Sequence, residues 1–279
     1  MNNSTLNFTT LEANTNHLSL LDSGEISLSC ISILFGFPIH SYVLWLIVRG
    51  AESGVASEFF ILNLSVCEIG NSLNALFNLL IDFFSQFTLI AYFLQGFAVT
   101  GRPLFQCLMC VERYLAVVHP VTFLKYKPLR YRVICCAVAW IITLGSCLFC
   151  MFTFESGLLS YIWFFSTQFF LFIFIQLFCL VAVLRALKQS EPGERKRKKE
   201  ENHMKRRAFY IILITTINIT VLYVPFSVTG FFVIVTQQYT FDGWFPASVC
   251  YALAGFVQPV LYLQRAGKLS CPTLGQILK

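Results

Sequence analysis

Two opposite charges stand deep inside apolar stretches of this sequence, where they could form a buried ion pair. Glu68 comes 11 residues after Ser57, at the start of one apolar run, and Arg102 comes 11 residues before Arg113, at the end of another. At a helical rise of about 1.5 Å per residue, both lie roughly 16 Å from the same edge of the runs. Because a lone charge in the middle of a membrane costs about 2.5–3.5 kcal/mol, we expect the two to pair. The alternative is a protonated Glu68 beside an Arg102 that reaches backbone carbonyls or water.

Two further polar side chains lie at similar depths. His40 precedes Arg49 by 9 residues and Gln258 precedes Arg265 by 7, which corresponds to depths of about 13 and 10 Å. With the charged pair they define a buried polar core of four residues. The chain has no glycine-rich phosphate loop, metal-ligand cluster or nucleophile motif. The sequence therefore predicts no enzyme, no metal site and no cofactor.

Membrane-spanning helices are the elements that must position these residues. The sequence is 57% hydrophobic and only 12% charged, whereas soluble domains are about 25% charged. About 20 apolar residues cross a bilayer as a helix, and lipid offers the backbone no other partners. Seven runs are long enough, so we expect an all-α membrane protein, a seven-transmembrane helix bundle. The runs cover residues 27–48, 57–81, 88–118, 131–153, 160–187, 207–235 and 243–264.

The distribution of lysine and arginine predicts the orientation of this bundle. With the N-terminus outside and the C-terminus inside, Arg49, the basic cluster at 185–207 and Arg265 all fall on the cytoplasmic side, as membrane proteins prefer. The net charge of +6 therefore reflects loop topology and attraction to the lipid bilayer, not a nucleic-acid partner. The expected organisation is an extracellular tail (1–26), a seven-transmembrane domain (27–264) and a short cytoplasmic tail (265–279).

Both tails contain sites for covalent modification. Asn2, Asn3 and Asn7 each begin an N-glycosylation sequon in the outer tail, which predicts a glycoprotein. Cys271 follows the last apolar run and is either a palmitoylation site or an unmodified thiol.

Motifs in five of the runs resemble the rhodopsin-like, class A family of G protein-coupled receptors over about residues 27–268. The third, sixth and seventh runs carry the most specific ones, which are Glu112-Arg113-Tyr114, Tyr223-Val224-Pro225-Phe226 and Gln258-Pro259-Val260-Leu261-Tyr262. The fourth run has Trp140, and the second has Asn63-Leu64-Ser65-Val66-Cys67-Glu68. Within the family the third-run motif is most similar to the branch of nucleotide, lipid and protease-activated receptors.

This resemblance implies a receptor of the plasma membrane that carries an extracellular ligand signal to a heterotrimeric G protein, with arrestin as a further partner. It implies that Arg113, held by Glu112 and followed by Tyr114, is a lock at the cytoplasmic face. Tyr262 would swing inward on activation, beside Gln258 and Pro259. Tyr223 and Pro225 would form the pivot of the sixth span.

The departures from the family pattern all concern its interior and its outer face. His40, Glu68, Arg102 and Gln258 stand where the family has Asn, Asp, a small hydroxyl residue and Asn. The family also ties the third span to the second extracellular loop with a disulfide, but neither 82–93 nor 151–163 contains a cysteine. We therefore expect an altered polar core and an untied outer loop.

The sequence excludes some classes of ligand but does not identify the ligand. By resemblance, the pocket would be lined by Gln95, Val99, Tyr223, Ser227 and Ser248, although these residues could equally be ordinary helix contacts. The outer halves of the runs contain no Lys or Arg, and such residues bind anionic ligands. The extracellular ligand is therefore unknown in identity and expected not to be anionic.

Two other classes of function compete with a ligand-activated receptor. The altered core and missing disulfide fit a constitutively active receptor, or a non-signalling, receptor-like partner of another protein. A transporter or channel would use Glu68 and Arg102 for conduction, but the runs show no repeated halves and no paired broken helices. Agonist-independent signalling separates the first alternative from the leading hypothesis.

Overall fold

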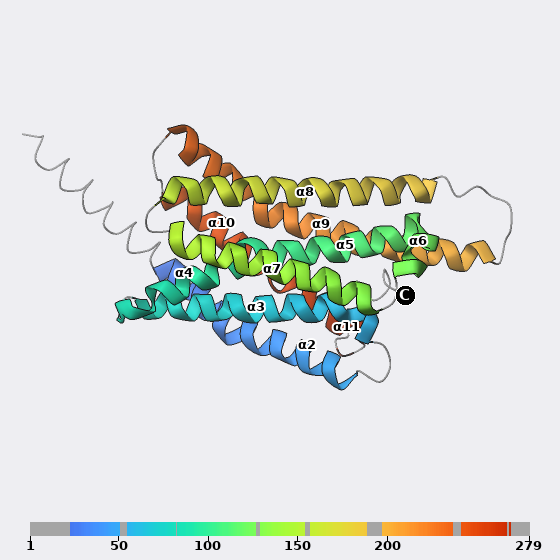
Figure 1. The fold of residues 1–279 in the computed structure, drawn as a ribbon, viewed down its shortest axis with the longest axis horizontal. Helices are drawn as coiled ribbons and strands as arrows, with labels where there is room; N and C mark the ends of the chain where they lie inside the picture. Colours follow the sequence, from blue (N-terminus) through green and yellow to red (C-terminus); the bar gives the residue numbers. More distant parts are fainter. Residues whose placement is uncertain are drawn as a thin grey trace, which may run out of the picture.

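The computed structural model describes residues 23–50, 55–81, 83–126, 129–153, 157–188, 197–236, 241–266 and 268. These residues form long helices that run side by side along one axis (Figure 1). Helix α8 borders one side of the bundle in this view and α2 the other, with α3, α5 and α7 between them. The protein is therefore an all-helical bundle.

Seven rods make up the bundle, and some are built from more than one helical piece. The first rod is Ser23–Arg49, with residues 23–31 followed by the π turn η1 and α2. The third rod joins α4, the π turn η3 and α5, and the seventh joins α10 and α11. The elements are η1 (Ser32–Gly36), α2 (Phe37–Arg49), α3 (Val55–Ile81), η2 (Ser85–Phe87), α4 (Thr88–Gly96), η3 (Phe97–Gly101), α5 (Arg102–Val118), α6 (Pro120–Tyr126), α7 (Leu129–Thr153), α8 (Leu158–Lys188), α9 (Arg197–Thr236), α10 (Phe241–Ala254) and α11 (Val257–Arg265).

Six of the seven rods are long and apolar enough to cross a membrane by themselves. The exception among the described residues is the third rod, because Arg102, Gln106 and the Glu112-Arg113 pair lower its hydropathy. This rod is nevertheless central, since it packs against α3, α7, α8 and α9. A helix surrounded by other helices need not be apolar toward lipid, so its polar residues are consistent with its place in the bundle.

The bundle is apolar outside and partly polar inside, which is the pattern of a membrane protein. Large hydrophobic side chains such as Phe35, Ile141 and Phe174 are more than 60% exposed. Each lies on a different rod. In contrast, Glu68, Arg102 and Asn63 inside the bundle are only 3%, 2% and 7% exposed. Lipid is the solvent that suits this surface.

Prolines explain the three irregular places in the rods. Proline has no N–H to donate, and its ring clashes with the carbonyl four residues earlier. The π turns η1 and η3 lie just before Pro38 and Pro103, and the break between α10 and α11 at residues 255–256 lies just before Pro259. The sixth span differs, because α9 continues through Pro225 as one helix, whereas the seventh span is broken four residues before its proline.

Candidate functional site

A buried ion pair lies at the centre of the bundle. The Arg102 guanidinium, at the first residue of α5, contacts the Glu68 carboxylate in the middle of α3. Both residues are at most 3% exposed. The ion pair that the sequence led us to expect is therefore present, and the alternative of an Arg102 satisfied by carbonyls and water alone does not describe this arrangement.

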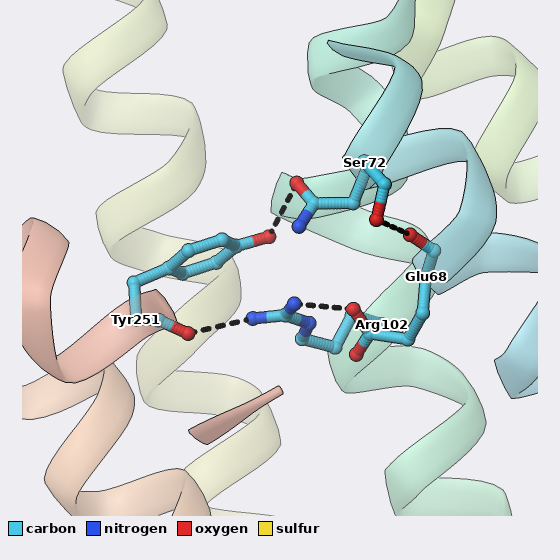
Figure 2. A network of polar contacts seen from close by, with 5 residues as sticks. Glu68, Ser72, Arg102 and Tyr251 are labelled. Atoms are coloured by element: carbon cyan, nitrogen blue, oxygen red, sulfur yellow. Dashed lines mark hydrogen bonds and ion pairs between the residues drawn. The ribbon is translucent and has the colours of Figure 1, made fainter. Parts of the chain in front are cut away.

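Tyr251 of α10 is the third member of this group, and it extends the pair to the seventh rod (Figure 2). Arg102 Nη1 donates to the Tyr251 carbonyl at 3.1 Å, and the guanidinium carbon lies 4.1 Å from the centre of the Tyr251 ring. The Tyr251 hydroxyl donates to Asn71 Oδ1 on α3 at 3.1 Å. A cation that stacks on an aromatic ring and also bonds an opposite charge is well satisfied away from water. Arg102 thereby joins three rods.

The same cation lies against the break in the seventh rod. A Cβ atom on Gly255 would come within 3.0 Å of Arg102 Nη2, so the glycine allows the close approach. His40, which is 3% exposed on α2, lies near the backbone of Gly255. Gln258 is half-buried in the first turn of α11, past the break. The polar core predicted from the sequence thus gathers around the point where α10 ends.

A second polar contact joins α3 to α7. Trp140 Nε1 donates to Asn63 Oδ1 at 2.8 Å, and Asn63 Nδ2 donates to the Phe59 carbonyl at 2.7 Å. The Trp140 ring also packs on Phe105 of α5. Asn63 and Trp140 were identified in the sequence only by resemblance. Through Trp140, the rods that contain α3, α5 and α7 are in contact.

The end of the bundle that carries Glu112 and Arg113, here called the motif end, holds two contacts between rods. Glu112 forms an ion pair with Arg132 of α7, which is 7% exposed. Tyr262 of α11 donates its hydroxyl to Glu58 Oε2 of α3 at 3.0 Å. Arg113 is half-buried on α5. These contacts connect four rods at the motif end.

The remaining motif residues lie on the same helices. The Tyr114 hydroxyl is 3.1 Å from His119 Nε2, at the C-terminal end of α5. Pro259 is buried in α11 and Pro225 lies half-buried in α9. Tyr223 is fully buried, and its ring packs on Phe169 of α8 with 4.2 Å between centroids. The expected pivot thus lies in the packed interior between α8 and α9.

A cavity of about 370 Å³ opens at the other end of the bundle, here called the cavity end. It includes three of the five residues expected to line a pocket, Gln95, Val99 and Ser248. Tyr251 and Asn71 also line it, so the ion pair lies directly behind the cavity wall. The lining residues come from α3, α4, η3, α8, α9, α10 and the first rod.

Tyr223 and Ser227 do not line this cavity, and for them the expected position was wrong. They are 0% and 1% exposed. Tyr223 belongs to a buried cluster with Val99 and Phe169. On α9, Phe226 lines the cavity instead.

Four of the site residues expected from the sequence fall outside the described part of the chain, and three residues that make contacts in the structure were not expected. Asn2, Asn3, Asn7 and Cys271 lie outside the described residues. The sequence did not identify three residues that contact the expected site residues, which are Tyr251, Arg132 and Glu58. Arg132 is one of several basic residues near the start of the fourth run, and nothing in the local sequence of Tyr251 distinguishes it from other aromatic residues of its span.

Seven rods around a polar core, with a cavity at one end and the Glu-Arg-Tyr motif at the other, define an integral membrane protein of the receptor type. The family model "7 transmembrane receptor (rhodopsin family)" matches residues 41–262. The chain belongs to this family.

Three curated relatives show what the chain is similar to. Human "C-C chemokine receptor type 8" is 26% identical over 77% of this chain and 64% of its own length. Mouse "Chemokine XC receptor 1" is 27% identical over 62% and 58%. Human "Uracil nucleotide/cysteinyl leukotriene receptor" is 29% identical over 37% and 30%. The chain therefore spans less than two thirds of the length of each of these relatives.

Proposed function

We propose that this protein is a multi-pass receptor of the plasma membrane that passes an extracellular ligand signal to heterotrimeric G proteins. The observation that carries the proposal is the position of Tyr251. Its side chain lines the cavity, and its ring and carbonyl both contact Arg102. Family membership and the three receptor relatives support the same function.

The proposed route runs from the cavity through the ion pair to the motif end. A ligand that moves Tyr251 changes the environment of a guanidinium bonded to α3 and packed on the break in the seventh rod. A ligand can shift a conformational equilibrium only through different contacts in the two states. Tyr251 supplies such a contact. The seventh rod continues past the break to Tyr262, so a change at the break reaches the contact with Glu58.

At the motif end, we propose that Arg113 is the residue on which G protein coupling depends. Two contacts hold the rods together at the motif end in this arrangement: the Glu112–Arg132 ion pair and the hydrogen bond from Tyr262 to Glu58. Opening this end for a G protein, or for arrestin, would break or weaken them. The two partners and the cavity ligand are then coupled reciprocally. The proposal requires the cavity end outside the cell, with residues 1–26 extracellular and 265–279 cytoplasmic.

The test is G protein activation in cells without added ligand, comparing the wild-type protein with Arg113→Ala at matched surface expression. A basal signal that the variant loses would support coupling through Arg113 and would identify the G protein class. Retention of the full signal by the variant would contradict the proposed role of Arg113.

A silent wild-type protein needs a second measurement. In that case the chain is tested with a panel of chemokine, nucleotide and lipid ligands against every G protein class. A response that depends on Arg113 supports a ligand-activated receptor. The absence of any response would contradict signalling and favour the alternative of a receptor-like partner protein.

A further inference from the structure

The cavity carries information about its ligand that the family does not supply. Three asparagines of α3, Asn71, Asn74 and Asn78, line it. They are three and four residues apart, so they form a stripe of amides on one helix face. Aromatic rings from the other rods, here called the aromatic wall, line the same cavity. They are Tyr161, Phe165, Phe169, Phe226 and Trp244. The lining thus combines a stripe of amides with several aromatic rings.

A chain of hydrogen bonds connects the asparagine stripe to two other rods of the bundle. Asn74 Nδ2 donates to Gln95 Oε1 at 2.7 Å, and Gln95 Nε2 donates to the Tyr161 hydroxyl at 3.2 Å. Asn74 is only 5% exposed, and its Oδ1 atom is buried without a hydrogen-bond partner. A buried acceptor left unpaired costs about 1–3 kcal/mol. Asn74 thus lines the cavity and holds a buried acceptor that lacks a donor.

The charge of the lining limits the ligand further. No Lys, Arg or His occurs among the described residues that line the cavity, and its one ionisable carboxylate is Glu25 at the mouth. A carboxylate or phosphate placed inside would meet amide and hydroxyl groups, aromatic faces and Glu25 but no Lys, Arg or His side chain of the described lining, and burying an unpaired charge is costly. Aromatic faces and carboxylates instead favour positive charge. The lining therefore disfavours anions.

We infer that the cavity takes a small, planar molecule without negative charge that donates an N–H or O–H hydrogen bond to Asn74. The aromatic wall contacts the flat body of this ligand, and the amide chain through Gln95 and Tyr161 orients Asn74 toward its donor. The inference rests on the proposed function only in the claim that binding of this ligand leads to G protein signalling. Binding itself is measured without a G protein, so failure of coupling would leave it untouched.

The experiment uses three probes that share an indole ring and differ in charge: indole-3-acetamide, tryptamine and indole-3-acetate. Each is added at millimolar concentration to the purified full-length protein in lipid nanodiscs, and the thermal unfolding midpoint is recorded. Ligands that bind only the folded state raise this midpoint. We expect the neutral and cationic probes to raise it by about 2–4 °C. The anionic probe should bind at least about tenfold more weakly.

Two variants separate recognition by Asn74 from general adsorption. Asn74→Leu removes the acceptor at similar volume and should weaken both productive probes by about tenfold. Thr153→Val is the matched control, because its hydroxyl bonds the Phe149 carbonyl of its own helix and Thr153 is not among the cavity lining. This control should bind like the wild-type protein.

Three results would overturn the inference. Equal or stronger stabilisation by indole-3-acetate would show that the cavity accepts anions. Unchanged binding by Asn74→Leu would show that Asn74 does not receive the donor. If none of the probes stabilises the wild-type protein, the assigned ligand class is wrong. The wild-type comparison requires no variant, so a poorly folding Asn74→Leu protein does not prevent the test.

Discussion

At the scale of single residues, the ion pair was predictable because two opposite charges stood at the same depth in two spans. The cost of an unpaired charge in lipid then made pairing the favoured outcome. Tyr251 was not predictable in the same way. Its contact with Arg102 depends on the rotation of the seventh rod, which the break at Gly255 and Pro259 sets. Likewise, Glu112 pairs with Arg132 only because α7 packs beside α5.

Exchange of the two charges tests the pair directly. Glu68→Arg and Arg102→Glu should each abolish most surface expression, because removing one partner of a buried pair costs about 3–5 kcal/mol. The double variant restores opposite charges and should recover a substantial part of the expression. Flow cytometry of an N-terminal epitope provides the measurement, and Arg130→Gln, at an exposed position of α7, is the control. A double variant that is no better than the singles would argue against a pairwise interaction.

At the scale of the elements, six of the seven rods followed from apolar length, whereas the irregularities of the rods followed from proline geometry. The prolines could be read from the sequence, whereas their effects differ between rods. Pro38, Pro103 and Pro259 each follow a π turn or a break, and α9 passes through Pro225 as one helix. Tertiary packing therefore decides how a membrane helix accommodates a proline.

The contact between Tyr262 and Glu58 joins α11 to α3 and should restrain the motif end. Tyr262→Phe keeps the ring in its cluster with Val43, Ile47 and Leu263 but removes the hydroxyl. The loss of one hydrogen bond, about 1 kcal/mol, corresponds to about a fivefold shift of an equilibrium. We expect basal G protein activation to rise by about that factor, at matched surface expression.

Glu58→Gln is the control for this prediction. The glutamine carbonyl still accepts a hydrogen bond from Tyr262, so basal activation should stay near the wild-type value. If Tyr262→Phe signals no more than the wild-type protein, or if both variants respond equally, the hydroxyl contact does not restrain the motif end.

At the scale of the whole molecule, the seven-rod bundle and its family were predictable because composition, length and motif order agreed. The third rod is the instructive case, since apolarity alone does not mark it as a span. Its motifs and its central position identify it instead. The cavity lining was predicted only in part, because the sequence does not determine how α9 is rotated about its axis. This rotation places Phe226, and not Tyr223 or Ser227, in the lining.

The predicted orientation has a chemical test in the outer tail. N-linked glycans are added only to segments that reach the lumen of the secretory pathway, so Asn2, Asn3 and Asn7 should be modified if residues 1–26 are extracellular. Digestion with a peptide N-glycanase should increase the electrophoretic mobility of the protein from cells. Replacement of all three asparagines by Gln should abolish that shift. A shift that persists in the triple variant would place the glycan elsewhere and contradict the expected topology.

The π turn at Phe97–Gly101 has a consequence for deletions in the third rod. A π turn accommodates one more residue than the α-helical path it replaces. Deleting a single residue there would therefore give a regular helix whose two halves keep their present directions, with Gln95 in the cavity lining and Arg102 beside Glu68. The same deletion in the regular helix α5 would rotate everything on one side of it by roughly 100° relative to the other. The third rod should therefore tolerate the loss of one residue at the π turn better than within α5.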